Sequence, residues 1–175
     1  MIEERILMPI SETLPSVVAI CISTGGIPKR PQMGEIFIFR QGLQGDGHHH
    51  EKHRRTEQAI CLQDWELLAE LKREGFPVGI GTIGENLTVK DLHVQKMSPG
   101  MVLKFTGGVI LELTKERRPC YVLDSIHPRL KEAIVGRCGY YARVLKEGIL
   151  SSGESMEVYS SESRTHPMEI AQNAL

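Results

Sequence analysis

Apolar and polar residues alternate over short stretches along most of the chain, which predicts many short strands. Residues 16–24 (SVVAICIST) are rich in β-branched side chains and are expected to form a buried strand, and residues 35–40 repeat the alternation. Other segments expected to be strands are 57–62, 92–94, 101–105, 109–114, 138–145 and 154–159. Turns with Gly or Pro recur roughly every 8–12 residues, which is typical of a barrel or a sandwich.

A helical pattern is confined to two stretches. Residues 64–74 (DWELLAELKRE) place Trp65, Leu68 and Leu71 on one face, so Trp65 is expected in the core. Asp64 is the better of two candidate N-caps, because its side chain supplies an acceptor. A shorter helix is expected at residues 129–135. Since strands and helices do not alternate regularly, we predict a mainly β fold with a few short helices, and no doubly wound sheet.

Length and composition suit one soluble domain. The chain has 175 residues, of which 41 % are hydrophobic and 25 % are charged. We predict a β-barrel-like domain over residues 16–159, an N-terminal extension over residues 1–15 and a polar tail over residues 160–175. The net charge of −1 gives no overall basic field that would attract nucleic acid, so any anion site must be local.

The cysteines and the first residues indicate a reducing compartment. Cys21, Cys61, Cys120 and Cys138 are widely spaced and form no C-x-x-C pair. The first residues (MIEERILMPI) are acidic and lack the apolar core of a signal peptide, and no run approaches the roughly 18 apolar residues of a membrane span. We therefore expect a cytoplasmic protein with free thiols and no membrane partner.

The segment ELTKERRPCYVLD, residues 112–124, carries the first candidate chemistry. Pro119 interrupts a strand, so that Cys120 can face a cavity instead of a ladder. Nearby Lys115, Arg117 and Arg118 would favour the thiolate, which is the form that attacks, carries sulfur or binds metal. The alternative is a small buried cysteine at the end of a strand, with the basic residues in solvent.

A glycine-rich loop followed by a histidine-rich run is the second candidate. Gly42, Gly45 and Gly47 precede four histidines at positions 48, 49, 50 and 53. The run could hold a metal, face an anionic ligand or be a solvated loop. Asp46 and His48 could move protons near a ligand or order the loop. The cations of this run are Lys52, Arg54 and Arg55.

The third candidate is the turn Gly84-Glu85-Asn86, where Asn86 could fix backbone groups or donate a hydrogen bond to a ligand. The glycines at positions 79, 81 and 84 fit G-x-G-x-x-G. A strand is expected to follow them, whereas a dinucleotide site needs a helix at that point.

The order of the motifs resembles that of a known family. The motifs are GLQGD at 42–46, His48 with the basic run, QAICLQDWELLAEL at 58–71, IGENLTV at 83–89, Pro99-Gly100, ELTKERRPC at 112–120 and GRCGYYARV at 136–144. Over residues 17–158 this succession resembles the MOSC domain, the module named after the C-terminal domain of molybdenum cofactor sulfurases.

The resemblance implies a barrel-like β fold and a molybdopterin cofactor. In that pattern Cys120 is the sulfur carrier or the thiolate ligand of molybdenum. Members with the second role resemble the amidoxime-reducing proteins, which reduce N-hydroxylated compounds. Cys21, Cys61 and Cys138 are interpreted as packing residues. The cofactor phosphate needs cations and the pterin needs polar partners. The candidates are Asp46, His48, Lys52, Arg54, Arg55, Asn86, Arg117 and Arg118.

The chain departs from the amidoxime-reducing members in one respect. It is expected to be a stand-alone domain, without their additional N-terminal module and without a pyridoxal-phosphate sulfurase region. Reduction would therefore need a redox partner, and sulfur carriage a sulfur donor. Two alternatives stay open, namely a non-catalytic molybdopterin-binding or trafficking module and a histidine-rich metal-binding protein.

Overall fold

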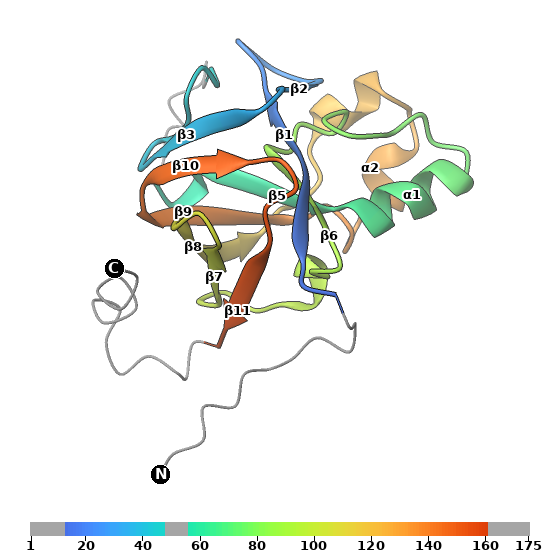
Figure 1. Cartoon of the computed structure of the whole chain (residues 1–175). Coiled ribbons are helices and arrows are strands. Elements are labelled where there is room, and N and C mark those ends of the chain that lie inside the picture. Colours follow the sequence, from blue (N-terminus) through green and yellow to red (C-terminus); the bar gives the residue numbers. More distant parts are fainter. Residues whose placement is uncertain (1–12, 48–55, 161–175) are drawn as a thin grey trace.

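The computed structural model describes residues 13–47 and 56–160, which form eleven strands, two α-helices and three 3₁₀ turns (Figure 1). The strands are β1 (Ser16–Ile22), β2 (Arg30–Pro31), β3 (Glu35–Phe39), β4 (Gly42–Leu43), β5 (Ile60–Asp64), β6 (Leu87–Lys90), β7 (Val102–Phe105), β8 (Ile110–Glu116), β9 (Tyr140–Lys146), β10 (Gly148–Ser151) and β11 (Met156–Tyr159). The helices are α1 (Trp65–Arg73) and α2 (Leu130–Ala133), and the 3₁₀ turns are η2 (Thr56–Gln58), η3 (Val94–Lys96) and η4 (Tyr121–Ser125).

The predicted mainly β fold is confirmed. Eight strands form one sheet in the order β11-β7-β8-β9-β5-β6-β1-β2, and three form a second sheet in the order β10-β3-β4. Within the described ranges these sheets do not close into one barrel. Strands β5 and β6 pair in parallel, and α1 lies in the connection between them. The strands begin at Ser16 and end at Tyr159, while the predicted division into extension, domain and tail stays a prediction.

Strand β5 is buried on both faces and separates two parts of the interior. Ile60 and Leu62 belong to a large apolar core built from most of the strands. Cys61 and Gln63 alternate with them along the strand and are also buried. A second apolar cluster, with Leu68 of α1 among its members, includes residues from both helices and from η4. The two helices lie together at one flank of the strands in Figure 1, and α1 packs against β5 and β6.

The strand predicted at residues 92–94 is wrong, and so is the capping role of Asp64. Residue Asp64 stands at the N-cap position of α1, but its side chain makes no capping hydrogen bond there. The carboxylate instead accepts from the backbone N–H groups of Val94 (2.8 Å) and Gln95 (3.1 Å). His93 adopts a left-handed conformation with φ of 53°, and the chain turns into η3. A buried carboxylate from a distant segment has overridden the local β pattern.

Trp65 was predicted in the core, but its side chain is 41 % exposed. The Nζ of Lys90 lies 6.0 Å from the centre of the indole ring, close enough for a weak cation–π contact. The buried residues of α1 are Leu68 and Leu71 alone, so the buried face of the helix is narrower than the pattern implied.

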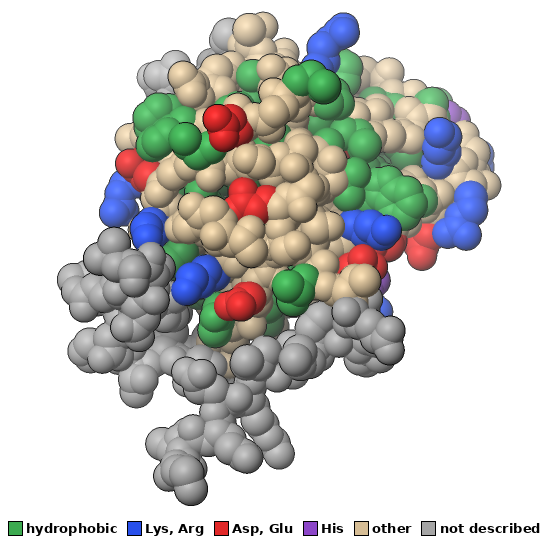
Figure 2. Space-filling model, viewed as in Figure 1, with side chains coloured by type: hydrophobic (Ala, Val, Ile, Leu, Met, Phe, Trp, Pro, Cys, Tyr) green, Lys and Arg blue, Asp and Glu red, His purple; other side chains and the backbone are tan. Residues whose placement is uncertain are grey.

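The three-stranded sheet buries Ile36 and Ile38 and turns other apolar side chains outward. Phe39 is 40 % and Ile149 is 49 % exposed, and apolar side chains gather over β3 and β10 in Figure 2. In the described part of the chain, no helix is long and apolar enough to cross a bilayer.

Candidate functional site

Cys120 is the accessible thiol of this chain. All four cysteines are free, and Cys120 is exposed whereas Cys21, Cys61 and Cys138 are buried. Cys120 follows the end of β8 and occupies the N-cap position of η4. Its carbonyl accepts a hydrogen bond from the backbone N–H of Leu123 (3.2 Å). A reagent, a metal or a partner protein can therefore reach this sulfur atom from solvent.

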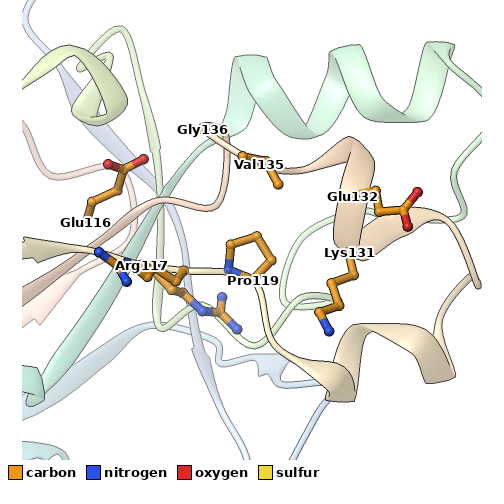
Figure 3. A pocket seen from close by; sticks show the side chains of 8 residues that line it. Glu116, Arg117, Pro119, Lys131, Glu132, Val135 and Gly136 are labelled. Atoms are coloured by element: carbon orange, nitrogen blue, oxygen red, sulfur yellow. The ribbon is translucent and has the colours of Figure 1, made fainter.

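A pocket of about 490 Å³ lies beside the segment that leads to Cys120. Its volume falls within the roughly 300–1,000 Å³ of small-molecule sites. The pocket is lined by Glu116, Arg117, Arg118, Pro119, Lys131, Glu132, Val135 and Gly136. In Figure 3, Lys131 and Glu132 extend from α2, and Pro119 comes from the segment after β8. Exposed Arg118 and Lys131 supply the cations that an anionic group on a ligand would need.

Arg117 points inward, unlike its neighbour Arg118. Only 8 % of Arg117 is exposed. Its Nη2 donates to the carbonyl of Ile83 (2.6 Å), and its Nη1 lies 3.8 Å from Cys61 Sγ. Burial works against the charge, but the neighbouring groups Cys61, Cys138, Tyr141 and Glu85 hold the pKa of Arg117 above its ordinary value. The guanidinium therefore ties the start of the Cys120 segment to the turn at residues 83–86.

Glu85 is a buried acid, and its charge and that of Arg117 affect each other's pKa. Its Oε1 accepts from the backbone N–H of Gly81 (2.6 Å) and from Thr88 Oγ1 (2.9 Å). Among the described residues Oε2 has no hydrogen-bond partner, and burial raises the pKa of the carboxyl group. The preceding Gly84 has φ of 91°, and a Cβ atom there would lie 2.5 Å from Ile27 Cγ2, so only glycine fits this turn.

Asn86 and Asp46 connect this turn to other segments of the chain through hydrogen bonds. Asn86 Oδ1 accepts from the N–H of Cys61 (3.0 Å), and its Nδ2 donates to Asp46 Oδ2 (2.9 Å). The Asp46 side chain is fully buried, accepts from the N–H of Ser23 (3.0 Å) and pairs with Lys29 Nζ (2.6 Å). We refer to Lys29, Asp46, Glu85, Asn86 and Arg117 as the inner polar cluster.

The predicted site residues thus fall into three groups. Cys120 and Arg118 are exposed at or beside the pocket. Asp46, Asn86 and Arg117 belong to the inner polar cluster, where their polar atoms contact the protein itself. The others, His48, Lys52, Arg54 and Arg55, lie outside the described residues. Contact of any of these residues with a cofactor stays a prediction.

The run His48, His49 and His50, for which a metal site was one of three interpretations, also lies outside the described residues. In the ranges 13–47 and 56–160, no group of three His, Cys, Asp or Glu residues could hold a metal ion.

Sequence reasoning missed several residues of this region. Lys29 was not singled out and Lys131 was only part of an expected helix, because neither belongs to a recognisable motif. Glu85 was seen as part of a polar turn, without the burial that sets its chemistry. Cys61 and Cys138 were interpreted as packing residues, and nothing in their spacing shows that both lie near Arg117.

One family model and two curated proteins match this sequence. The family model described as "MOSC domain" matches residues 46–157. A protein named "Reductase" from Gibberella moniliformis is 31% identical over 143 residues, which cover 77% of this chain and 26% of that protein. The uncharacterized protein YflK from Bacillus subtilis is 31% identical over 147 residues, which cover 77% of this chain and 63% of that protein. The chain therefore spans less than two thirds of the length of either curated relative.

Solved structures show the same fold. The YuaD protein from Bacillus subtilis has a TM-score of 0.72 at 18% identity and covers 85% of this chain and 97% of its own. YiiM from Geobacillus stearothermophilus has a TM-score of 0.68 at 25% identity, covering 83% of this chain and 75% of its own. YiiM from Escherichia coli has a TM-score of 0.67 at 22% identity, covering 85% and 71%.

Proposed function

The chain belongs to the MOSC domain family, and from this premise we propose that it binds a molybdopterin-type cofactor at the surface around Cys120. The observation that carries the proposal is the contrast among the thiols. Of four cysteines, the one that follows Arg-Arg-Pro is exposed beside a pocket with two exposed cations, and the other three are buried.

The donor set around Cys120 suits such a group. A soft thiolate is an appropriate ligand for molybdenum or carrier for sulfur. Arg118 and Lys131 can pair with a phosphate, and the pocket has room for a small ligand. Lys52, Arg54, Arg55 and His48 remain further candidates for cofactor contacts. When bound, the cofactor would supply a redox-active metal centre.

The inner polar cluster has a supporting part in this proposal. Asn86 binds Asp46 and the backbone, and Arg117 binds the backbone, so these three residues would hold the site in shape, and their contact with the pterin stays a prediction. Arg117 is the first residue of the segment that presents the thiol. It anchors the segment through its side chain to the Ile83 carbonyl and through its N–H to the carbonyl of Gly139 (2.9 Å).

The reaction proposed for the loaded protein is a reduction, with N-hydroxylated compounds as the substrate class. The name "Reductase" of the relative from Gibberella moniliformis supports this choice over simple storage. The match covers 26% of that protein, and we propose that a redox partner supplies the electrons. A cytoplasmic location is part of the same proposal.

The test is the cofactor content of purified protein from a molybdenum-replete host. We expect stoichiometric pterin and molybdenum in the wild type, and loss of both in Cys120→Ser. Cys21→Ala serves as the matched control because Cys21 is buried away from solvent. Unchanged pterin in Cys120→Ser would exclude this thiol as the ligand.

Further outcomes separate the alternatives. Reduction of an N-hydroxylated base with a supplied electron-transfer protein would distinguish an enzyme from a trafficking module. Nickel or zinc in place of pterin, lost when His48, His49 and His50 are replaced, would favour a histidine-rich metal protein and contradict the proposal.

A further inference from the structure

Two of the four cysteines, Cys61 and Cys138, lie near one buried cation, the guanidinium of Arg117. Cys61 Sγ lies 3.8 Å from Arg117 Nη1, and Cys138 is near enough to Arg117 for the two groups to affect each other's ionisation. A negative charge on Cys120 also acts on both Cys138 and Tyr141. Cys138 is therefore a buried thiol close enough to the exposed thiol for their charges to interact.

The backbone brings Cys120 and Cys138 to the same place. The N–H of Arg117 donates to the carbonyl of Gly139 (2.9 Å), so the segment after β8 starts beside the residues that precede β9. Pro119 and Gly136 line the same pocket, and Leu123 shares a buried cluster with Cys138.

The segment between these anchors is loosely held. Pro119 has no N–H, and the N–H groups of Arg118 and Cys120 donate no hydrogen bond to any residue that the structure describes. The next anchor is the bond from the Leu123 N–H to the Cys120 carbonyl (3.2 Å). Rotations in residues 118–120 would therefore move Cys120 without breaking a strand.

Cys138 has the reactivity of a protected thiol. Burial raises its pKa to about 11, and the charge of Arg117 acts in the opposite direction. At neutral pH it is therefore a neutral thiol that solvent reagents do not reach. It would react with a sulfur that is already activated and held beside it, because proximity replaces a bimolecular encounter.

We propose that Cys138 is the resolving thiol for sulfur carried on Cys120. The inference rests on the proposed function in its sulfur-carrier form. The sulfur of Cys138 loses its proton and attacks Sγ of the Cys120 persulfide. A bond forms between the two cysteine sulfurs, the bond from Cys120 Sγ to the outer sulfur breaks, and the outer sulfur leaves as hydrosulfide with the bonding electron pair. An external dithiol then reduces the disulfide and restores both thiols.

Cys61 is the natural comparison, because it is also buried and near Arg117. However, it lies within β5, and its N–H is fixed by Asn86 Oδ1. Cys138 lies outside the strands, in the connection just before β9. The proposal therefore assigns the resolving role to Cys138 and a packing role to Cys61.

The experiment uses the full chain, reduced and kept free of oxygen. Protein is treated with inorganic polysulfide, separated from excess reagent, alkylated and digested without reductant for mass spectrometry. The wild type is expected to give a peptide pair linked through Cys120 and Cys138. Cys138→Ser should lose this pair and accumulate Cys120 with one added sulfur atom, while Cys61→Ser should keep the pair.

Two results would overturn the proposal: a stable Cys120 persulfide in the wild type without the linked pair, or a link from Cys120 to Cys61. The wild-type protein alone tests the proposal, even if Cys138→Ser folds poorly. Cys138→Ala provides a second variant. Because no molybdopterin takes part, the outcome is independent of the cofactor content that tests the proposed function.

Discussion

Arg117 and Arg118 are adjacent in the sequence but belong to two regions, one buried and one exposed to solvent. Arg118 is on the exposed surface around Cys120, next to Lys131 and open to solvent. Arg117 is in the inner polar cluster, 8 % exposed, with its guanidinium bound to the Ile83 carbonyl. The same residue type thus serves as a possible ligand contact in one region and as an internal anchor in the other.

Stability and ligand binding therefore depend on different residues in this fold. Exposed charges contribute little to stability, because water screens them, so a surface can be tuned for a ligand at little structural cost. Removing one partner from a buried charged network is strongly destabilising, since the other partner is left without compensation. Mutations in the two regions should therefore give different readouts.

Asp46→Ala should have the largest effect on stability. The buried carboxylate pairs with Lys29 and accepts from Ser23 and Asn86, so its removal leaves three donors without an acceptor. We expect a loss of about 3–5 kcal/mol in the free energy of unfolding, measured by urea denaturation. Asp46→Asn combined with Lys29→Met should recover part of this loss, because no unpaired charge remains. A change for Asp46→Ala no larger than that of a surface variant would contradict the buried network.

Arg117→Met should also destabilise the fold, whereas Arg118→Met should not. Without the guanidinium, the Ile83 carbonyl loses its donor and Glu85 loses a cation that favours its charged form, for an expected loss of about 3 kcal/mol. The matched variant Arg118→Met should leave the urea midpoint at the wild-type value, because the side chain is exposed. Equal midpoints for the two variants would remove the distinction between the two regions.

Glu85→Gln should change the pH dependence of stability. Burial raises the pKa of Glu85, so the native state retains a proton that the unfolded state has released. The stability from this group is fully present below the ordinary glutamate pKa and is lost as the pH rises through the raised native pKa. Relative to Glu85→Gln, wild-type stability should therefore fall with rising pH, by at most about 1.4 kcal/mol per pH unit. Glu132→Gln, at an exposed position, is the control, and a parallel curve for Glu85→Gln would contradict the assignment.

The sequence was sufficient for the parts of the fold that depend on local pattern. The β-branched alternation of β1 and the helical period of α1 are properties of neighbouring residues, and both elements lie where the pattern predicts. The family, too, followed from the order of short motifs.

The rest depends on contacts between distant segments. Asp46 and Asn86 are 40 positions apart, and Arg117 and Cys61 are 56 apart, so no local pattern shows that they meet. The error at Asp64 has the same origin, because its carboxylate binds a backbone N–H group 30 positions away. Trp65 was misplaced because the helical period does not show how much of a helix face the rest of the chain covers, and in α1 only Leu68 and Leu71 are buried. A sequence shows which residues are polar, whereas burial separates Arg117 from Arg118.

The most direct test of this separation is the amount of pterin bound to folded Arg118→Met/Lys131→Met protein from a molybdenum-replete host. We expect a wild-type urea midpoint together with a clear loss of bound pterin, because the two exposed cations of the pocket would pair with the cofactor phosphate. Wild-type pterin content in this double variant would show that the cofactor, if bound, is held elsewhere, and would contradict the assignment of the surface around Cys120.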